Sequence, residues 1–339
     1  MRMRQFARRA VLRVAGAALA APAIAHHARA ANIKWRLGHV APLDTPLHRR
    51  LLEAADAIAK RSDGMMELAV IGEGRAGIQS GLLAQVRGGG MEMTVATCTQ
   101  LASTVPLCSI PMIGFLFRDY ANLWQTMDGE LGQLIRSQVP TQSGVVTLEK
   151  IWDFGFRQIT TATHPIQNAA DLVGLKIRTQ IDVDEMDMFR ALAVIPVVIT
   201  LPYLRMALQH HQIDGQEGML PIVEYARLNE VQSYCAMTRH IWDGLWLCIN
   251  PSAWRNLPER LQNIVANTLN GAAQRQREDS AKMEEAVRAS LGRTGMKFTD
   301  VDLESFRDTL HRQGYYARIR AKLGEQAWAV VQKATGVLS

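Results

Sequence analysis

The chain has 339 residues, of which 48% are hydrophobic, and a formal net charge of +6 at pH 7. This length can bury a large core, and it more often folds as two lobes than as one. Six arginines and no acidic residue fall in the first thirty residues. Subtracting them from the 38 basic residues leaves 32 against 32 acidic residues, so the remainder is neutral. Without a basic stripe with interleaved aromatics, the composition argues against a nucleic-acid-binding protein.

The first thirty residues are typical of an export signal. A small apolar run over residues 14–25 follows a basic segment, and small residues around Ala30 offer a cleavage site. The run is too short to span a bilayer. The pair Arg8 and Arg9 is typical of a twin-arginine signal, with an ordinary Sec signal as the alternative. The sequence therefore predicts a soluble periplasmic protein whose signal peptide is removed near Ala30.

The four cysteines, Cys98, Cys108, Cys235 and Cys248, lack the close C-x-x-C spacing of a zinc or redox site. Cys235 and Cys248 could form a bridge between neighbouring strands in an oxidising compartment, and buried free thiols are the alternative. The sequence predicts neither a metal site nor a cofactor.

The first part of the mature chain alternates strands with helices. Apolar patterning predicts strands over 35–40, 67–71 and 91–96. Helix-start residues at 44–46 precede apolar residues at helical spacing, and a shorter helix is expected over 79–86. Strands that alternate with helices are typical of a parallel sheet in an α/β fold.

The same alternation continues in the second part of the chain. The expected strands lie over 145–151, 175–178, 194–199, about 234–237 and 245–249. Helices are expected over 182–192, with an acidic first turn, and from Pro202. After Pro258 the chain turns almost wholly helical, over 259–291 and 303–331. No Pro-, Gly- or Ser-rich linker separates two lobes, so interleaved lobes joined by strands are expected.

Two arginines, Arg157 and Arg178, each lie at the edge of a short apolar run. A guanidinium at a strand end can donate two parallel hydrogen bonds to a carboxylate, and its charge does not titrate. The pair is therefore a candidate clamp for an organic acid, with surface arginines in salt bridges as the alternative.

Three short segments follow one another in a characteristic order. Residues 176–178 read Lys-Ile-Arg, residues 201–209 read Leu-Pro-Tyr-Leu-Arg-Met-Ala-Leu-Gln, and residues 213–217 read Ile-Asp-Gly-Gln-Glu. This succession, taken with Arg157, resembles the substrate-binding proteins of tripartite ATP-independent periplasmic (TRAP) transporters, the dicarboxylate-binding-protein family. The likeness extends more weakly over nearly the whole mature chain.

The resemblance implies an α/β two-lobe periplasmic binding protein fold, with hinge strands, a ligand cleft and long C-terminal helices. Projected onto this chain, lobe I comprises residues 31–154 and 244–283, and lobe II comprises residues 155–243 and 284–339. The lobes would close over the ligand by a hinge motion. The implied function is a receptor, not an enzyme, that delivers an organic acid to the permease subunits of a TRAP transporter. A ligand-binding subunit that serves a sensor is an alternative.

The resemblance also implies where the ligand binds. Arg178 matches the carboxylate-binding arginine, Arg157 would add a second cation, and Glu217 ends the Asp-Gly-x-Glu element that borders the cleft. Trp152 lies beside a predicted crossing between the lobes, where an aromatic side chain can contact a ligand or fill the core.

Two positions depart from sialic-acid-binding relatives of the family. Those relatives carry an Asn after the Asp-Gly-x-Glu element and an acid after the third strand, where this chain has Gly218 and Thr97. The loss of an amide and a carboxylate removes contacts suited to a polyhydroxylated sugar acid. Gly218 and Thr97 remain candidate ligand-binding positions.

A glycine motif supports a different class of function. Gly72, Gly74 and Gly77 form a G-x-G-x-x-G pattern between a predicted strand and a predicted helix, as in a dinucleotide site. A secreted dinucleotide-dependent oxidoreductase is therefore the alternative to a receptor. The motif follows the second predicted strand, however, and the acid about twenty residues further on, Glu92, opens a strand instead of ending one.

Overall fold

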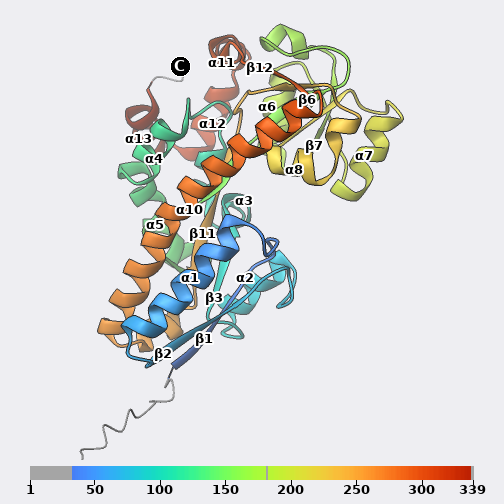
Figure 1. The fold of residues 1–339 in the computed structure, drawn as a ribbon. Helices are drawn as coiled ribbons and strands as arrows, with labels where there is room; N and C mark the ends of the chain where they lie inside the picture. The colour runs from blue at the N-terminus through green and yellow to red at the C-terminus, as the bar shows by residue number, and fades with distance from the viewer. Residues whose placement is uncertain (1–32, 181, 337–339) are drawn as a thin grey trace, which may run out of the picture.

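The computed structural model describes residues 33–180 and 182–336. The predicted export signal lies outside these residues. Within them, the strands form two six-stranded sheets, each accompanied by helices (Figure 1). None of the described helices is both long and apolar enough to cross a membrane.

The first sheet has the strand order β2-β1-β3-β11-β4, and β5 also pairs with β11. Its strands are β1 (Ile33–Gly38), β2 (Met66–Ile71), β3 (Met93–Thr97), β4 (Val146–Thr147), β5 (Trp152–Phe156) and β11 (Trp242–Ile249). β1 pairs in parallel with β2 and β3, whereas β11 runs antiparallel to β3, β4 and β5. The N-terminal strands thus form the parallel sheet expected for an α/β fold.

Helix α1 (Pro46–Arg61) illustrates why these segments adopt their structure. Thr45 caps the helix by accepting a hydrogen bond from the backbone N–H of His48, and Pro46 occupies the first turn. The buried face consists of Leu47, Leu51, Ala54, Ala55 and Ile58. This face packs against β2 and against the long helix α10 (Glu259–Arg293), so α1 lies between the sheet and α10.

The second sheet has the strand order β12-β10-β6-β9-β7-β8. Its strands are β6 (Gln158–Thr161), β7 (Lys176–Thr179), β8 (Ile195–Val198), β9 (Gly215–Gly218), β10 (Tyr234–Ala236) and β12 (Lys297–Thr299). β7 pairs in parallel with β8 and β9, whereas β6 is antiparallel to β9 and β10. The helices between these strands are α6 (Val183–Ala191), α7 (Leu201–Gln209) and α8 (Leu220–Tyr225).

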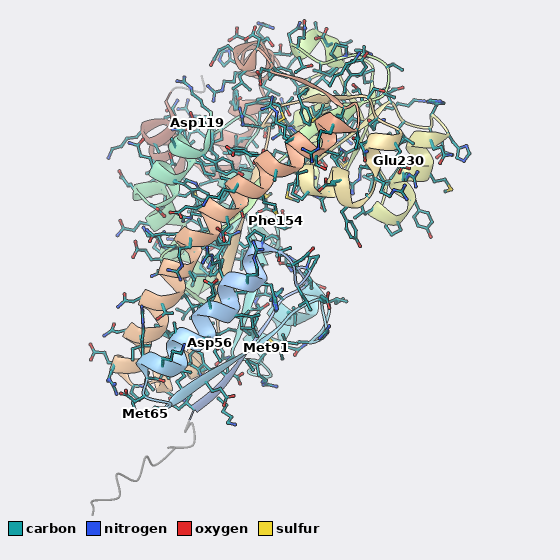
Figure 2. All side chains as sticks on the ribbon, in the orientation of Figure 1. Asp56, Met65, Met91, Asp119, Phe154 and Glu230 are labelled. Carbon is teal, nitrogen blue, oxygen red and sulfur yellow. The ribbon has the colours of Figure 1, made fainter. Side chains whose placement is uncertain are left out.

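Two chain segments cross between the sheets. β5 leads to β6 through Arg157, and residues 237–241 lead from β10 to β11. A hydrogen bond of 2.9 Å from the Arg157 backbone N–H to the Ile241 carbonyl joins the two segments. Helix α10 runs alongside both parts of the molecule in Figure 1 and contacts α1, β5 and α8. Phe154 of β5, labelled in Figure 2, shares a small cavity with Glu284 of this helix.

The C-terminal helices α11 (Leu303–Arg312), α12 (Tyr315–Leu323) and α13 (Glu325–Thr335) contact elements that precede and follow the first crossing. α11 and α12 contact α6, whereas α13 contacts α4 (Tyr120–Met127) and α5 (Glu130–Ser143). The remaining α-helices of the described chain are α2 (Gln79–Arg87), α3 (Cys98–Ala102) and α9 (Pro251–Asn256). The predicted lobe boundaries, and the assignment of the helices to the lobes, stay a prediction.

The strand expected over 145–151 is much shorter in the structure, where β4 covers only Val146–Thr147. The buried residues of this segment are Val145, Leu148 and Ile151, which recur every third residue. Only every second residue of a strand faces the same side, so this spacing does not suit a strand.

All four cysteines lie within the described residues as free, buried thiols. Cys235 is on β10 of the second sheet, whereas Cys248 is on β11 of the first. The structure therefore has the free thiols of the alternative interpretation and no bridge between these two residues.

Candidate functional site

A cavity of about 430 Å³ lies where the crossing segments meet the second sheet. Its apolar wall consists of Met112, Val198, Ile199, Leu201 and Ile241. Its polar and charged wall consists of Thr99, Arg157, Arg178, Gln180, Asp182, Glu185, Thr200 and Asp243. The lining residues come from both sheets, from the crossing segments and from the starts of helices α6 and α7.

Arg178 reaches this cavity from the C-terminal half of β7. Its strand pairs with β8 on one side and β9 on the other, and the residue is 9% exposed. The Nε atom donates a hydrogen bond of 2.8 Å to the carbonyl of Ile199, which fixes the plane of the guanidinium. Burial lowers the pKa of Arg178 below its ordinary value, and the neighbouring Glu217 opposes this effect. Among the described residues, neither Nη atom makes a hydrogen bond, so both can donate to an anion in the cavity.

Arg157 lies at the junction of β5 and β6 and is held on several sides. Its Nε and Nη2 atoms donate to the two carboxylate oxygens of Glu217, forming a buried bidentate ion pair. In the amide orientation that satisfies both groups, the Gln180 oxygen accepts from both Nη atoms, at 2.5 and 2.8 Å. Burial alone would lower the pKa of Arg157, but the Glu217 carboxylate outweighs it and raises this pKa. Arg157 is therefore largely committed to protein partners.

Glu217 lies on the central strand β9 and is fully buried. Its Oε1 atom is 3.7 Å from Nη1 of Arg178, and its Oε2 atom is 3.6 Å from Nε2 of His240. Burial alone would raise the pKa of Glu217, but Arg157 and His240 outweigh it and hold this pKa below its ordinary value. The ionised carboxylate thus sits behind both arginines and positions them, and it does not itself line the cavity.

Three other candidate positions also lie outside the cavity lining. Thr97 ends β3 and caps α3, exchanging hydrogen bonds of 3.1 Å with Gln100. Trp152 is 1% exposed and belongs to the apolar core around α1 and α10. Gly218 ends β9 opposite Gln158 of β6. The structure brings Arg157, Arg178 and Glu217 together, and it places these three positions in supporting elements.

Asp243 is a lining residue that the sequence patterns did not single out. It lies on β11 at a break in the pairing with β5. Its Oδ1 atom accepts from the backbone N–H groups of Cys98 and Gly244, at 3.0 and 2.8 Å, and Thr99 donates to Oδ2 at 3.3 Å. Burial raises the pKa of Asp243 to about 6. The sequence signal that indicates Asp243 as a site residue is a carboxylate inside an otherwise apolar strand.

Glu185 is a second lining residue that the sequence patterns missed. The acidic start of this helix is confirmed, because Asp182 caps α6 by accepting from the backbone N–H of Glu185 at 2.9 Å. Glu185 is nevertheless buried, on the same face as Met188 and Phe189. A carboxyl three and four residues before buried apolar residues is the signal that distinguishes it from the solvated acids of a helix start.

The glycine motif forms the turn between β2 and α2 and does not resemble a dinucleotide site. β2 is the edge strand of its sheet, whereas a dinucleotide binds where the strand order reverses. Gly74 and Gly77 have φ values of +68° and +136°, and a Cβ on Gly72 would lie 2.7 Å from Leu43. The tight turn accounts for these glycines, and the oxidoreductase alternative is not supported.

No group of three or more His, Cys, Asp or Glu side chains is placed to hold a metal ion within residues 33–180 and 182–336.

Comparison with known proteins finds a matching family model and a relative that is similar in sequence. The family model described as bacterial extracellular solute-binding protein, family 7, matches residues 37–319. An uncharacterised protein of Sinorhizobium fredii, y4mM, is 30% identical over 305 residues. The aligned region covers 89% of this chain and 56% of that protein, so the chain spans little more than half of that relative's length.

Two solved structures are similar over nearly their full length. A TRAP periplasmic solute-binding protein from Ochrobactrum anthropi has a TM-score of 0.85 and 25% identity, over 90% of this chain and 97% of that one. Its C-terminus is bound in its ligand-binding pocket. A TRAP periplasmic solute-binding protein from Polaromonas, bound to D-erythronate, has a TM-score of 0.77 and 26% identity, over 88% and 98% of the two chains.

Proposed function

Because the chain belongs to the bacterial extracellular solute-binding proteins of family 7, we propose that it is a periplasmic receptor for an organic acid that supplies a TRAP-type permease. The acid binds through a carboxylate in the cavity between the crossing segments and the second sheet. The observation that carries this proposal is the guanidinium of Arg178, whose Nη atoms are free of hydrogen bonds within the described chain.

The surroundings of Arg178 suit the capture of a carboxylate. The guanidinium is nine-tenths buried, and the carbonyl of Ile199 fixes its plane before any ligand arrives. A bidentate pair formed at such a partly dehydrated and preorganised group is stronger than one at the surface. The Polaromonas neighbour binds D-erythronate, a carboxylic acid, which supports the same ligand class for this chain.

The other predicted residues support the Arg178 clamp in different ways. Arg157 adds positive charge to the cavity wall, and Glu217 holds both guanidiniums in place. Thr97 caps the helix whose first turn carries Thr99, a lining residue. We retain Trp152 and Gly218 as predicted ligand-site residues in a state where the lobes have closed.

The receptor acts by binding and release, with no catalytic step. The two hydrogen-bonded crossing segments provide the natural hinge, because the chain passes between the sheets there. Closure brings residues that line the cavity from both sheets onto one ligand, and release hands the acid to the permease. The leader of residues 1–30, removed near Ala30, carries the protein to the periplasm.

Native mass spectrometry of freshly purified protein tests this function. We expect a retained small molecule whose mass corresponds to a carboxylic acid. Calorimetric titration should then show that the primary amide of the same acid binds at least about 30-fold more weakly, since the amide cannot form the charged bidentate pair. Equal binding of the acid and its amide would contradict the proposal. If cells that lack the TRAP-type permease take up the acid as before, the receptor would serve a sensor instead.

A further inference from the structure

The cavity contains a carboxyl group that the carboxylate clamp does not need. Glu185 projects from the first turn of α6, lines the cavity and is only 7% exposed. Both arginines pair with Glu217 and not with Glu185. The carboxyl of Glu185 accepts a long hydrogen bond of 3.4 Å from the backbone N–H of Gln180 and also lies within hydrogen-bonding reach of the Glu217 carboxylate. A buried acid that faces a second, ionised carboxylate favours its neutral form, because the neutral form can donate its proton to that carboxylate.

The groups around Glu185 already carry at least as much negative charge as positive charge. The guanidiniums of Arg157 and Arg178 supply two positive charges, whereas the carboxylates of Glu217, Asp243 and Asp182 supply three negative ones. His240 is neutral, because burial lowers its pKa. An ionised Glu185 would therefore add to the negative charge around the cavity and would repel an incoming acid.

The remaining charged groups near α6 do not neutralise Glu185. Asp182, at the cap of the helix, adds negative charge at the rim of the cavity. Asp184 and Asp187 turn away and pair with Lys322 and Arg318 of α12. On α11, Arg307 donates to the Phe115 carbonyl and to Glu304. None of these cations in the described chain pairs with Glu185, and the positive charge of Arg157, which is bound to Glu217, only partly opposes the effect of burial on the pKa of Glu185.

We propose that Glu185 is a specificity-determining residue which the receptor keeps protonated, so that the cavity accepts acids with a single carboxylate and rejects dicarboxylates. The proposal rests on the receptor function argued above. With Glu185 neutral, the charges of the two arginines are offset by Glu217 and Asp243, Asp182 adds one negative charge at the rim, and one added carboxylate can pair with the Nη atoms of Arg178. A second carboxylate would find Arg157 already engaged by Glu217 and would lie among Asp182, Asp243 and Glu217. The rest of the wall offers apolar side chains, the amide of Gln180 and the hydroxyls of Thr99 and Thr200, and no further cation among the described residues that line it.

The titration of Glu185 agrees with this assignment. Burial first, and the charge of Glu217 second, raise the pKa of Glu185 to about 9. The protonated form therefore dominates at neutral pH, and the binding-competent form is lost as the pH rises through about 9.

Infrared spectroscopy tests the protonation of Glu185 without any ligand. At pH 7.5 the wild type should show the stretching band of a protonated carboxyl group that Glu185→Gln lacks. The exposed Glu224→Gln serves as the matched control and should keep the band. If Glu185→Gln and the wild type have the same protonated-carboxyl band, the proposal is wrong. Should the variant fold poorly, the same band in the wild type must disappear as the pH is raised past about 9.

Thermal-shift and calorimetric titrations test the selectivity. The probes are matched pairs of three- to six-carbon monocarboxylates and dicarboxylates, including D-erythronate and succinate. We expect the best monocarboxylate to bind at least about 30-fold more tightly than the dicarboxylate of the same length. Its affinity for the wild type should fall by up to about tenfold per pH unit above pH 9, and Glu185→Gln should bind up to about tenfold more tightly than the wild type at pH 10.

The outcomes separate the two proposals. Tighter binding of dicarboxylates, or an affinity that does not change up to pH 10, would overturn the role of Glu185. If neither the wild type nor Glu224→Gln binds any carboxylic acid, the receptor function itself fails, and the infrared band still decides the protonation of Glu185.

Discussion

The guanidinium of Arg178 keeps its Nη atoms free of hydrogen bonds to the described residues, whereas that of Arg157 is bound to Glu217 and Gln180. The two arginines are close in the fold but unequal in what they can offer a ligand. Arg178 is the group that can form a new bidentate pair, and Arg157 contributes charge from behind it. Substitution of Arg178 should therefore weaken ligand binding more than substitution of Arg157.

Truncation of Arg178 should abolish most of the binding of the retained acid. A carboxylate left without its partner in a buried site costs about 2–5 kcal/mol, or roughly 30- to several-thousand-fold in affinity. Arg178→Lys should not restore binding, because one ammonium cannot reproduce the planar fork. Calorimetric titration checks both variants, with the exposed Arg190→Ala of α6 as the control. If Arg178→Ala binds the acid with an affinity within about threefold of wild type, Arg178 is not the residue that binds the carboxylate.

Replacement of Glu217 should destabilise the fold. Glu217→Gln leaves two buried guanidiniums without their carboxylate, which costs about 3–5 kcal/mol in the free energy of unfolding. The pKa of Glu217 is lowered on folding, so its contribution is present above the ordinary pKa of 4.5 and is lost as the pH falls below it. The difference between the variant and the wild type should therefore shrink in acid.

Urea unfolding at pH 7.5 and pH 3.5 measures this effect of Glu217→Gln. Glu230, labelled in Figure 2, forms exposed pairs with Arg205 and Arg227, and Glu230→Gln should change the free energy of unfolding by only about 0–1 kcal/mol. Equal effects of the two substitutions at pH 7.5 would show that the buried pair does not hold the site together.

At the scale of single elements, the break in β11 depends on the absence of a side chain. Gly244 follows the bulge, and a Cβ there would lie 2.4 Å from Trp242 and 2.5 Å from Ile151. Gly244→Ala should lower the free energy of unfolding by about 1–3 kcal/mol through overpacking. Gly271 lies in α10 with only the flexible end of Arg275 nearby, at 3.6 Å. Gly271→Ala should stabilise the protein by about 0.5–1 kcal/mol.

Chemical denaturation of the two glycine variants provides the comparison. The same added methyl group should have opposite effects at the two positions, because one faces a packed crossing strand and the other faces open space. A neutral Gly244→Ala would mean that the crossing region can repack around an added Cβ, and a destabilised Gly271→Ala would mean that the space beside α10 at this position is not open.

The elements that carry long apolar patterns could be predicted from the sequence, and the short strands at the crossing could not. β1, β2, β3 and β11 lie within a few residues of their predicted positions. β5, β6 and β9 were missed. β9 reads Gly-Gln-Glu-Gly, all buried, and the hydrogen-bond partners of its two polar side chains lie far along the chain. Gln216 donates to Thr160, and Glu217 binds Arg157.

The sequence predicts only part of the site, because local patterns do not report packing between segments that are distant in the chain. Arg157, Arg178 and Glu217 were found because their segments follow one another in a recognisable order. Glu185 and Asp243 lie in local patterns that read as a helix start and as an apolar strand. Their burial in the cavity depends on packing between segments that are distant in sequence, which no local pattern reports.

At the scale of the whole molecule, the predicted α/β fold and the resemblance to TRAP solute-binding proteins are confirmed. Lobe closure remains a prediction that scattering can check. Saturation with the retained acid should reduce the radius of gyration, because residues of both sheets line the cavity. Tryptophan emission should also change, since Trp242 of the crossing strand packs edge-on against Phe117 and Trp124.

The matched control for closure is Arg178→Ala at the same concentration of acid. This variant should show neither the smaller radius nor the change in emission. A scattering curve of the wild type that does not change at saturation would count against a hinge motion, although not against binding.

The four buried thiols make the order of folding and membrane passage important. In the folded chain no cysteine is exposed, and burial raises the pKa of Cys108 and Cys235 to about 12, so the reactive thiolate is scarce. A chain that crossed the membrane unfolded would instead present four accessible thiols to periplasmic oxidants, which can join them in pairings that the fold does not contain. A chain that folds before it crosses the membrane has already buried its thiols, so the oxidants cannot join them in wrong pairs. The predicted twin-arginine pair, Arg8 and Arg9, belongs to a route that carries folded proteins, and the unbridged cysteines give such a route a chemical advantage.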